Sequence, residues 1–233
     1  MKKRDLVLNI VFAILVVVVL IGILLDNPML EYLFRPLIML WIALYFLLNA
    51  KKRTFMSGVL TAFFFSWVGD IFVLLSGAYG NDSFFFVGTG SFSLSLLTYI
   101  FLFLFSTEND IKGLLLRNPF WIIPLAAYGL FLALLLYPRL EGFTVYLILF
   151  YIILLTGMSL SALNRRDRVN FNSFRLVFAG SLFFVISGSL LAVHSFHTEI
   201  PYADFMIMLT FIAAQYLIMR GLIFEKERPG TRE

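Results

Sequence analysis

The sequence predicts an all-α polytopic membrane protein with eight transmembrane helices and cytoplasmic N- and C-termini. Three observations predict this fold class: the composition, eight long apolar runs and the placement of the basic residues. The 233-residue chain is 61% hydrophobic and 14% charged, whereas soluble domains average roughly 45–50% apolar and about 25% charged residues. A soluble fold of this length cannot bury so much apolar surface, which excludes a soluble enzyme, a disordered chain and a nucleic-acid-binding module.

Eight runs are long enough to cross a bilayer, which takes about 20 mainly apolar residues. The first follows Lys2, Lys3 and Arg4, as in a signal peptide, but it is too long for one and no Ala-x-Ala site follows, so we expect a retained helix. Uninterrupted apolar runs also exclude the alternating strands of a membrane barrel. We expect one transmembrane domain over residues 1–233, with spans near 6–25, 30–49, 55–76, 84–105, 120–137, 143–163, 174–195 and 203–224.

The basic residues fix the orientation. Alternating spans put 16 of the 18 Lys and Arg residues on the side of the N-terminus and only Arg35 and Arg139 on the other side. By the positive-inside rule the basic side is the cytoplasm, and we expect a bacterial inner membrane. The basic segment 164–175 is then a cytoplasmic loop that faces anionic lipid headgroups, not a nucleic-acid site.

Two charges lie clearly within the spans, away from their ends, Arg35 in the second and Asp70 in the third. Ionisable groups inside a membrane are costly and tend to be functional. From the rise of an α-helix, both lie about 8–9 Å below the outer edge on consecutive antiparallel helices. We therefore predict an Arg35–Asp70 contact, either as a buried ion pair that only satisfies itself or as part of a polar cavity that opens outward.

Other polar residues lie at comparable or greater depth. We expect Ser91, Tyr99, Ser187 and Gln215 to be candidate hydrogen-bonding residues of the cavity, although small residues in membrane helices often serve packing alone. His194 and His197 fall at the outer mouth and are interpreted as solvated interfacial residues. The sequence has no Cys and two His, and we expect no metal and no organic cofactor.

A weak internal similarity relates spans three and four to spans seven and eight. Gly69-Asp70 aligns with Ser187-Gly188 at an offset of 118, and Ser91-Phe92 aligns with Thr210-Phe211 at an offset of 119. Both pairs keep their orientation, which suggests two parallel four-helix halves about an axis along the membrane normal. Asp70 and Gly188 would then face one central cavity.

Five segments, in order on the expected helices, resemble the lysoplasmalogenase-like (YhhN) family of eight-helix membrane proteins. They are Arg35-Pro36-Leu37, which is similar to the family's Lys-Pro-Leu, Gly69-Asp70, and the segments 86–100, 180–196 and 213–218.

The resemblance implies hydrolysis of the vinyl ether bond of a lysoplasmalogen, a lipid substrate, within a membrane. A vinyl ether is cleaved by protonation of its β-carbon, which gives an oxocarbenium ion that water captures. One group must donate the proton, and a carboxylate can stabilise the cation or activate the water. Asp70 is the matching carboxylate, and Arg35 would orient it or a substrate phosphate.

The chain departs from the family pattern at two polar positions. Gly188 stands where the span-seven signature carries Asp, and Leu96 stands where span four usually carries His. These changes leave open an alternative, a catalytically degenerate member that acts as a non-enzymatic lipid-binding or structural membrane protein. A small transporter is a third interpretation. It is disfavoured because only one acidic residue, Asp70, lies clearly within a span, which leaves little for ion coupling.

Overall fold

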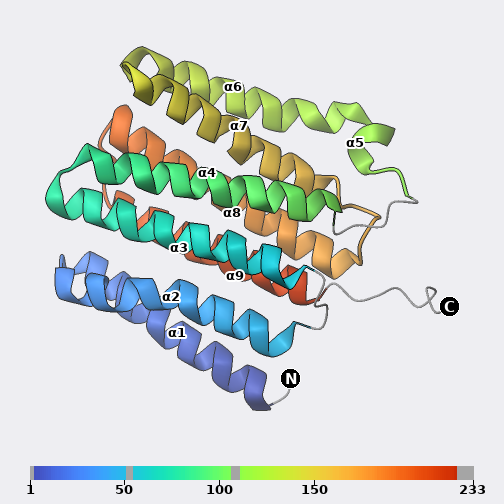
Figure 1. Cartoon of the computed structure of the whole chain (residues 1–233), viewed down its shortest axis with the longest axis horizontal. Helices are drawn as coiled ribbons and strands as arrows, with labels where there is room; N and C mark the ends of the chain where they lie inside the picture. Colours follow the sequence, from blue (N-terminus) through green and yellow to red (C-terminus); the bar gives the residue numbers. More distant parts are fainter. Residues whose placement is uncertain (1–2, 51–54, 106–110, 225–233) are drawn as a thin grey trace.

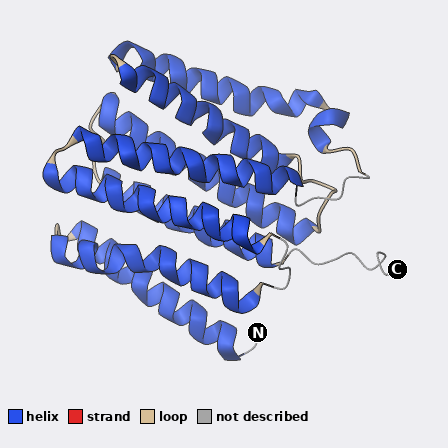
Figure 2. Ribbon diagram, viewed as in Figure 1, coloured by secondary structure: helices blue, strands red, loops and turns tan. Residues whose placement is uncertain are grey.

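The structure is a computed structural model that describes residues 3–50, 55–105 and 111–224. In these ranges every regular element is a helix (Figure 2). The elements are α1 (Lys3–Leu24), α2 (Pro28–Asn49), α3 (Met56–Tyr79), α4 (Asp82–Phe105), the short α5 (Leu114–Arg117), α6 (Ile122–Leu136), α7 (Phe143–Leu163), α8 (Phe171–Phe196) and α9 (Ala203–Ile223). Single 3-10 turns, Pro119–Trp121 and Tyr137–Arg139, flank α6. Eight helices, with α6 taken together with its flanking turns as Pro119–Arg139, are long and apolar enough to cross a membrane, as predicted. The short helix α5 was not predicted.

Helices α3, α4, α8 and α9 form the centre of the bundle (Figure 1). Helix α7 packs against α4 and α8 on one side, and α2 packs against α3 and α9 on the other. Helices α6 and α1 lie outermost, against α7 and α2. Apolar side chains of the outer helices, such as Ile10, Ile14, Val17 and Ile21 of α1, are exposed. Their spacing of three to four residues makes one helical face, which suits contact with lipid.

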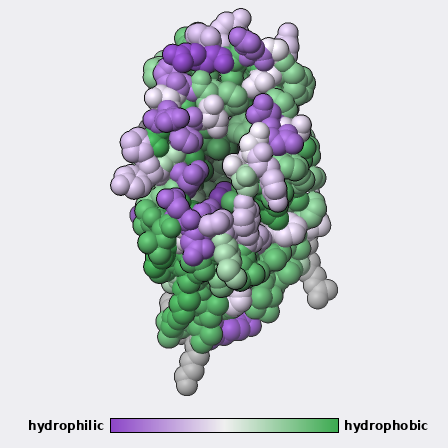
Figure 3. Space-filling view, turned by 90° about the vertical axis from the view of Figure 1, so that its left-hand side faces the viewer, coloured by the Kyte–Doolittle hydropathy of each residue, from purple (hydrophilic) through white to green (hydrophobic). Residues whose placement is uncertain are grey.

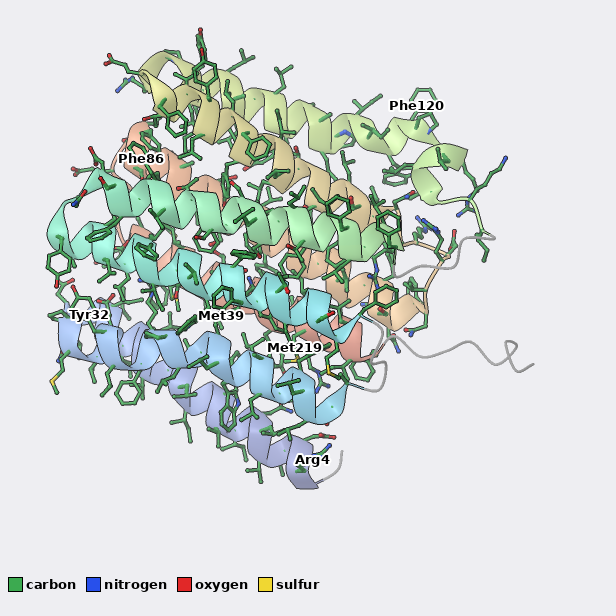
Figure 4. The ribbon with its side chains drawn as sticks, viewed as in Figure 1. Arg4, Tyr32, Met39, Phe86, Phe120 and Met219 are labelled. Carbon is green, nitrogen blue, oxygen red and sulfur yellow. The ribbon has the colours of Figure 1, made fainter. Side chains whose placement is uncertain are left out.

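The start of α1 and the end of α9 lie at the same end of the bundle, at the right of Figure 1. The described basic residues at this end, which the positive-inside rule assigns to the cytoplasm, belong to the start of α1, to α5 and the segment before it, to the segment between α7 and α8 with the first turns of α8, and to the end of α9. Arg35 and Arg139 belong to the opposite end. Arg4 marks the cytoplasmic end of α1 in Figure 4, and Tyr32 marks the outer end of α2. The predicted basic residues of segments 1–2, 51–54 and 225–233 lie outside the described residues.

Local sequence signals set the ends of the helices that carry the site. Helix α2 begins after Asn27, whose side chain accepts a hydrogen bond from the Leu30 N–H, with Pro28 in the first turn. This is the usual N-cap arrangement. Helix α3 ends at Gly80, which has a left-handed backbone (φ 59°) that glycine adopts without strain. The short turn then reverses the chain into α4.

Glycines bring the central helices into close contact. A β-carbon on Gly88 of α4 would lie 3.1 Å from the Gly69 carbonyl oxygen of α3. A β-carbon on Gly180 of α8 would lie 2.9 Å from the Ala214 carbonyl oxygen of α9. Small residues at such crossings allow the backbones to approach, as in other membrane bundles. The two closest helix pairs are the ones that the internal similarity relates, and the 4+4 repeat itself stays a prediction.

Candidate functional site

The predicted contact between Arg35 and Asp70 is present. Nε and Nη2 of Arg35 on α2 both donate to Oδ1 of Asp70 on α3, at 3.0 and 2.8 Å. Both side chains are buried, with 9% and 5% of their surfaces exposed. The carboxylate of Glu31, one turn earlier on α2, lies 3.9 Å from Nη1 of Arg35. Arg35 therefore bridges a deep carboxylate and a shallower one.

The second carboxylate oxygen of Asp70 sets this pair apart from a simple ion pair. Oδ2 of Asp70 is buried and has no hydrogen-bond partner among the described residues. Buried polar atoms are almost always hydrogen-bonded, so an exception calls for an explanation. Arg35 directs two N–H donors to Oδ1, so Oδ2 remains a strong acceptor without a partner among the described residues. At this depth water reaches Oδ2 only through a cavity.

Such a cavity opens at the outer end of the bundle, between α2, α3, α8 and α9. Its volume is about 230 Å³, and its lining includes Glu31, Tyr32, Arg35, Gly77 and Asp204. Figure 3 looks onto this end and shows hydrophilic residues around a central hollow, with hydrophobic flanks. We call it the outer cavity. Its polar lining and its opening agree with the predicted outward-facing polar cavity.

A second, smaller space lies next to it. This inner cavity, of about 20 Å³, is lined by Asp70, Tyr151, Ser187 and Gly188 among others. Arg35 lines both cavities and stands where they meet. About 10–15 Å³ is enough for one water molecule, so the inner cavity fits a single hydroxyl-sized group beside Asp70.

Three phenylalanines close the inner cavity toward the cytoplasm. Phe92, Phe184 and Phe211, from α4, α8 and α9, line the cavity and pack edge to face, with ring centroids 5.7 to 6.3 Å apart. This arrangement is the favoured geometry for aromatic pairs. We call these residues the aromatic floor.

Tyr99 and Gln215 lie beyond the aromatic floor and are buried in the centre of the bundle. The Tyr99 hydroxyl donates to Oε1 of Gln215 at 2.6 Å, and Nε2 of Gln215 donates to the Ser66 hydroxyl at 2.8 Å. Ser66 in turn pairs with Ser95, which donates to the Ala62 carbonyl oxygen. The network links α3, α4 and α9, and its members line neither of the two cavities. Its geometry fits a structural role better than the substrate contact expected for Tyr99 and Gln215.

The remaining predicted residues divide between the cavity and its surroundings. Ser187 lines the inner cavity, but its hydroxyl donates to the Ile207 carbonyl oxygen at 2.9 Å. Ser91 is buried and lines neither cavity. Nδ1 of His194 accepts a hydrogen bond from the Ile200 N–H and so holds the loop between α8 and α9.

Glu31, Asp204 and Tyr151 line the cavities but were not among the predicted site residues. Glu31 could have been found from its spacing of four residues from Arg35, which places both on one helix face. Asp204 stands in the first turn of α9, just inside the outer end. Tyr151 lies within the uninterrupted apolar run 143–163, and nothing in that run marks it as polar lining. Among the described residues no group of three or more His, Asp or Glu could hold a metal ion.

The fold and the site define an integral membrane protein with a buried Arg–Asp pair beneath a cavity open to the outer side. A family model describes this class: residues 30–222 match the YhhN family, and the chain belongs to that family. The match covers every helix that lines the two cavities. Comparisons with curated proteins and with solved structures find no match.

Proposed function

We propose that the protein is a lysoplasmalogenase-like membrane hydrolase that cleaves the vinyl ether bond of an ether lysolipid, with Asp70 as the central residue. One observation carries the proposal. The buried Oδ2 atom of Asp70 has no partner among the described residues, and Asp70 lines the inner cavity next to the outward-opening one. Membership of the YhhN family is consistent with this activity. We further propose that the protein resides in a bacterial inner membrane.

The chemistry needs a negative charge close to the scissile bond. An acid donates a proton to the vinyl β-carbon, which places positive charge on the ether carbon and oxygen; water then adds to that carbon and returns a proton to the base left behind. In the resulting hemiacetal the bond from that carbon to the glycerol oxygen breaks and the hydroxyl proton passes to the glycerol oxygen, so the products are an aldehyde and a glycerophospho-headgroup with a free glycerol hydroxyl. The free oxygen of Asp70 can stabilise the oxocarbenium ion or accept a proton from the attacking water. Arg35 keeps the Asp70 carboxylate fixed through Oδ1, which is how a site gains preorganisation.

The outer cavity suits a lipid headgroup. Its polar lining includes Glu31, Arg35 and Asp204, and it opens at the membrane surface, where headgroups lie. A lysolipid of the outer leaflet would place its headgroup at this opening and its glycerol toward Arg35. The vinyl ether, attached to the glycerol, would then reach the region of Asp70.

The test is aldehyde release by the purified protein in nanodiscs that contain a lysoplasmalogen. We expect the wild-type chain to release aldehyde and Asp70→Asn to reduce the rate at least about a hundredfold, since loss of an electrostatic contact to a transition state costs about 10²–10³ in rate. Asp82→Asn is the matched control, because Asp82 is exposed at the same end of the bundle and lines neither cavity. Equal rates for wild type and Asp70→Asn would refute the assignment.

A second candidate is a non-enzymatic lipid-binding protein. The observation that favours it is Gly188, which lines the inner cavity where the family resemblance leads us to expect a second carboxylate. In that case the wild-type protein would release no aldehyde but would still bind an ether lysolipid, and Asp70→Asn would weaken that binding. The same preparations therefore distinguish the two functions.

A further inference from the structure

The inner cavity contains a second polar group, the hydroxyl of Tyr151. Tyr151 comes from α7 and is 4% exposed, so it is as well buried as Asp70. Within the part of the chain that the structure describes, its hydroxyl makes no hydrogen bond. The inner cavity is thus bordered by two side chains with unused hydrogen-bonding capacity, a carboxylate oxygen and a phenol.

Gly188 explains how the phenol comes to lie there. A β-carbon at position 188 would overlap the Tyr151 hydroxyl and would lie 3.2 Å from its ring carbon Cζ. Any side chain at this position would therefore displace the hydroxyl. Gly188 lacks the carboxylate that the family resemblance leads us to expect on α8, and it makes room for the Tyr151 hydroxyl from α7.

The two groups are complementary. The phenol can donate one hydrogen bond and an ionised carboxylate can only accept. A hydroxyl group both donates and accepts, so it can satisfy both at once, and a volume of about 20 Å³ fits one group of this size. Neither an ammonium nor a carbonyl group matches both partners, because an ammonium group cannot accept from the phenol and a carbonyl cannot donate to Asp70.

We propose that Tyr151 and Asp70 together bind one hydroxyl group, with Tyr151 donating to it and Oδ2 of Asp70 accepting from it. The identity of that hydroxyl rests on the proposed function. It is either the free alcohol on the glycerol of a lysolipid or the water that attacks the ether. The alcohol would make Tyr151 a determinant of specificity, since a diacyl lipid has no such proton to donate and its ester does not fit.

The first arm of the test measures binding by calorimetry in nanodiscs, with a short-chain 1-O-alkyl lysophospholipid that cannot be cleaved and its O-methyl derivative, in which the free hydroxyl is blocked. If the hydroxyl is the glycerol alcohol, wild type should prefer the free hydroxyl by about tenfold, and Tyr151→Phe should reduce this preference to below about threefold, as expected for a lost hydrogen bond to a charged network. Tyr146→Phe, on the exposed side of the same helix, is the matched control and should behave as wild type.

The second arm measures aldehyde release. If the hydroxyl is water, wild type binds both analogues equally, and Tyr151→Phe should lower kcat about tenfold or more with KM unchanged. Gly188→Ala should reproduce whichever effect Tyr151→Phe has, and the double variant should add no further loss, because both changes remove the same hydroxyl from the cavity.

The outcomes separate this inference from the proposed function. A wild-type protein that releases aldehyde, with Tyr151→Phe equal to it in rate and in preference for the free hydroxyl, overturns the inference alone. A wild-type protein that releases none but prefers the free hydroxyl through Tyr151 overturns hydrolysis and supports the hydroxyl site. A wild-type protein that neither releases aldehyde nor distinguishes the two analogues overturns both.

Discussion

The buried pair of Arg35 and Asp70 should act as one energetic unit, and its removal one residue at a time tests this. Asp70→Leu leaves the Arg35 guanidinium buried, with the Glu31 carboxylate at 3.9 Å as its remaining ion-pair partner and Asp204 elsewhere in the lining of the outer cavity. Removal of one partner from a buried pair costs about 3–5 kcal/mol, whereas replacement of both by apolar residues is often neutral. We expect Asp70→Leu and Arg35→Met each to lower the free energy of unfolding by about 3 kcal/mol.

The double variant provides the decisive comparison. Arg35→Met with Asp70→Leu buries no charge, so its loss should be smaller than the sum of the single losses by at least about 2 kcal/mol, the size expected for directly coupled residues. Reversible unfolding in bicelles by titration with SDS would measure all four proteins. Additive losses below about 1 kcal/mol each would show that solvent in the outer cavity already screens the pair, and the electrostatic argument for Asp70 would fall with them.

Three further predictions concern the packing, the buried network and the topology. Gly180→Leu should separate α8 from α9 and abolish folding, because a β-carbon there would lie 2.9 Å from backbone of α9. Gly77→Ala should be tolerated, because no atom lies within 4 Å of a β-carbon at that position. Measurements of thermal stability would show the contrast. Gln215→Leu removes two hydrogen bonds and should cost about 1–3 kcal/mol in SDS unfolding, with aldehyde release per folded molecule unchanged; a selective loss of activity would contradict the structural role. In this Cys-free chain, Glu141→Cys should react with an impermeant maleimide from outside in intact cells and Arg166→Cys should not; the reverse pattern would invert the orientation.

The sequence was sufficient to predict the eight spanning helices, because the length of an apolar run does not depend on which helices touch. The orientation, which rests on the count of basic residues in each loop, stays a prediction. The Arg35–Asp70 contact also followed from depth alone, since consecutive antiparallel helices lie side by side. The ends of the predicted spans differ from the ends of the helices by at most three residues, and several coincide. Caps such as Asn27 and Gly80 set the boundary at ends that differ.

The cavity lining could not be predicted in the same way, because depth does not say which way a side chain points. Tyr99 and Gln215 fall at a plausible depth, but the aromatic floor separates their network from the inner cavity. Tyr151 is the opposite case. Its helix contains no charged residue that would mark a polar site, and only the packing of α7 against α8 brings its hydroxyl to the cavity. The aromatic floor excludes Tyr99 and Gln215, and rotation about the axis of α7 brings Tyr151 to the cavity. Both depend on contacts between helices far apart in the sequence.

The same packing changes what a restored carboxylate at position 188 would do. Gly188→Asp alone would force the Tyr151 hydroxyl out of the inner cavity, since the β-carbon and the phenol cannot share the space. When Gly188→Asp is combined with Tyr151→Phe, the new carboxylate has room, and the inner cavity then holds two carboxylates. Two carboxylates repel each other and share a proton more readily than a carboxylate and a phenol do. We expect Gly188→Asp to lower stability and activity, and the double variant to recover stability and to show aldehyde release with a stronger dependence on pH than wild type. Full tolerance of Gly188→Asp in the presence of Tyr151 would mean that the phenol moves freely, and then Tyr151 could not hold a hydroxyl in place.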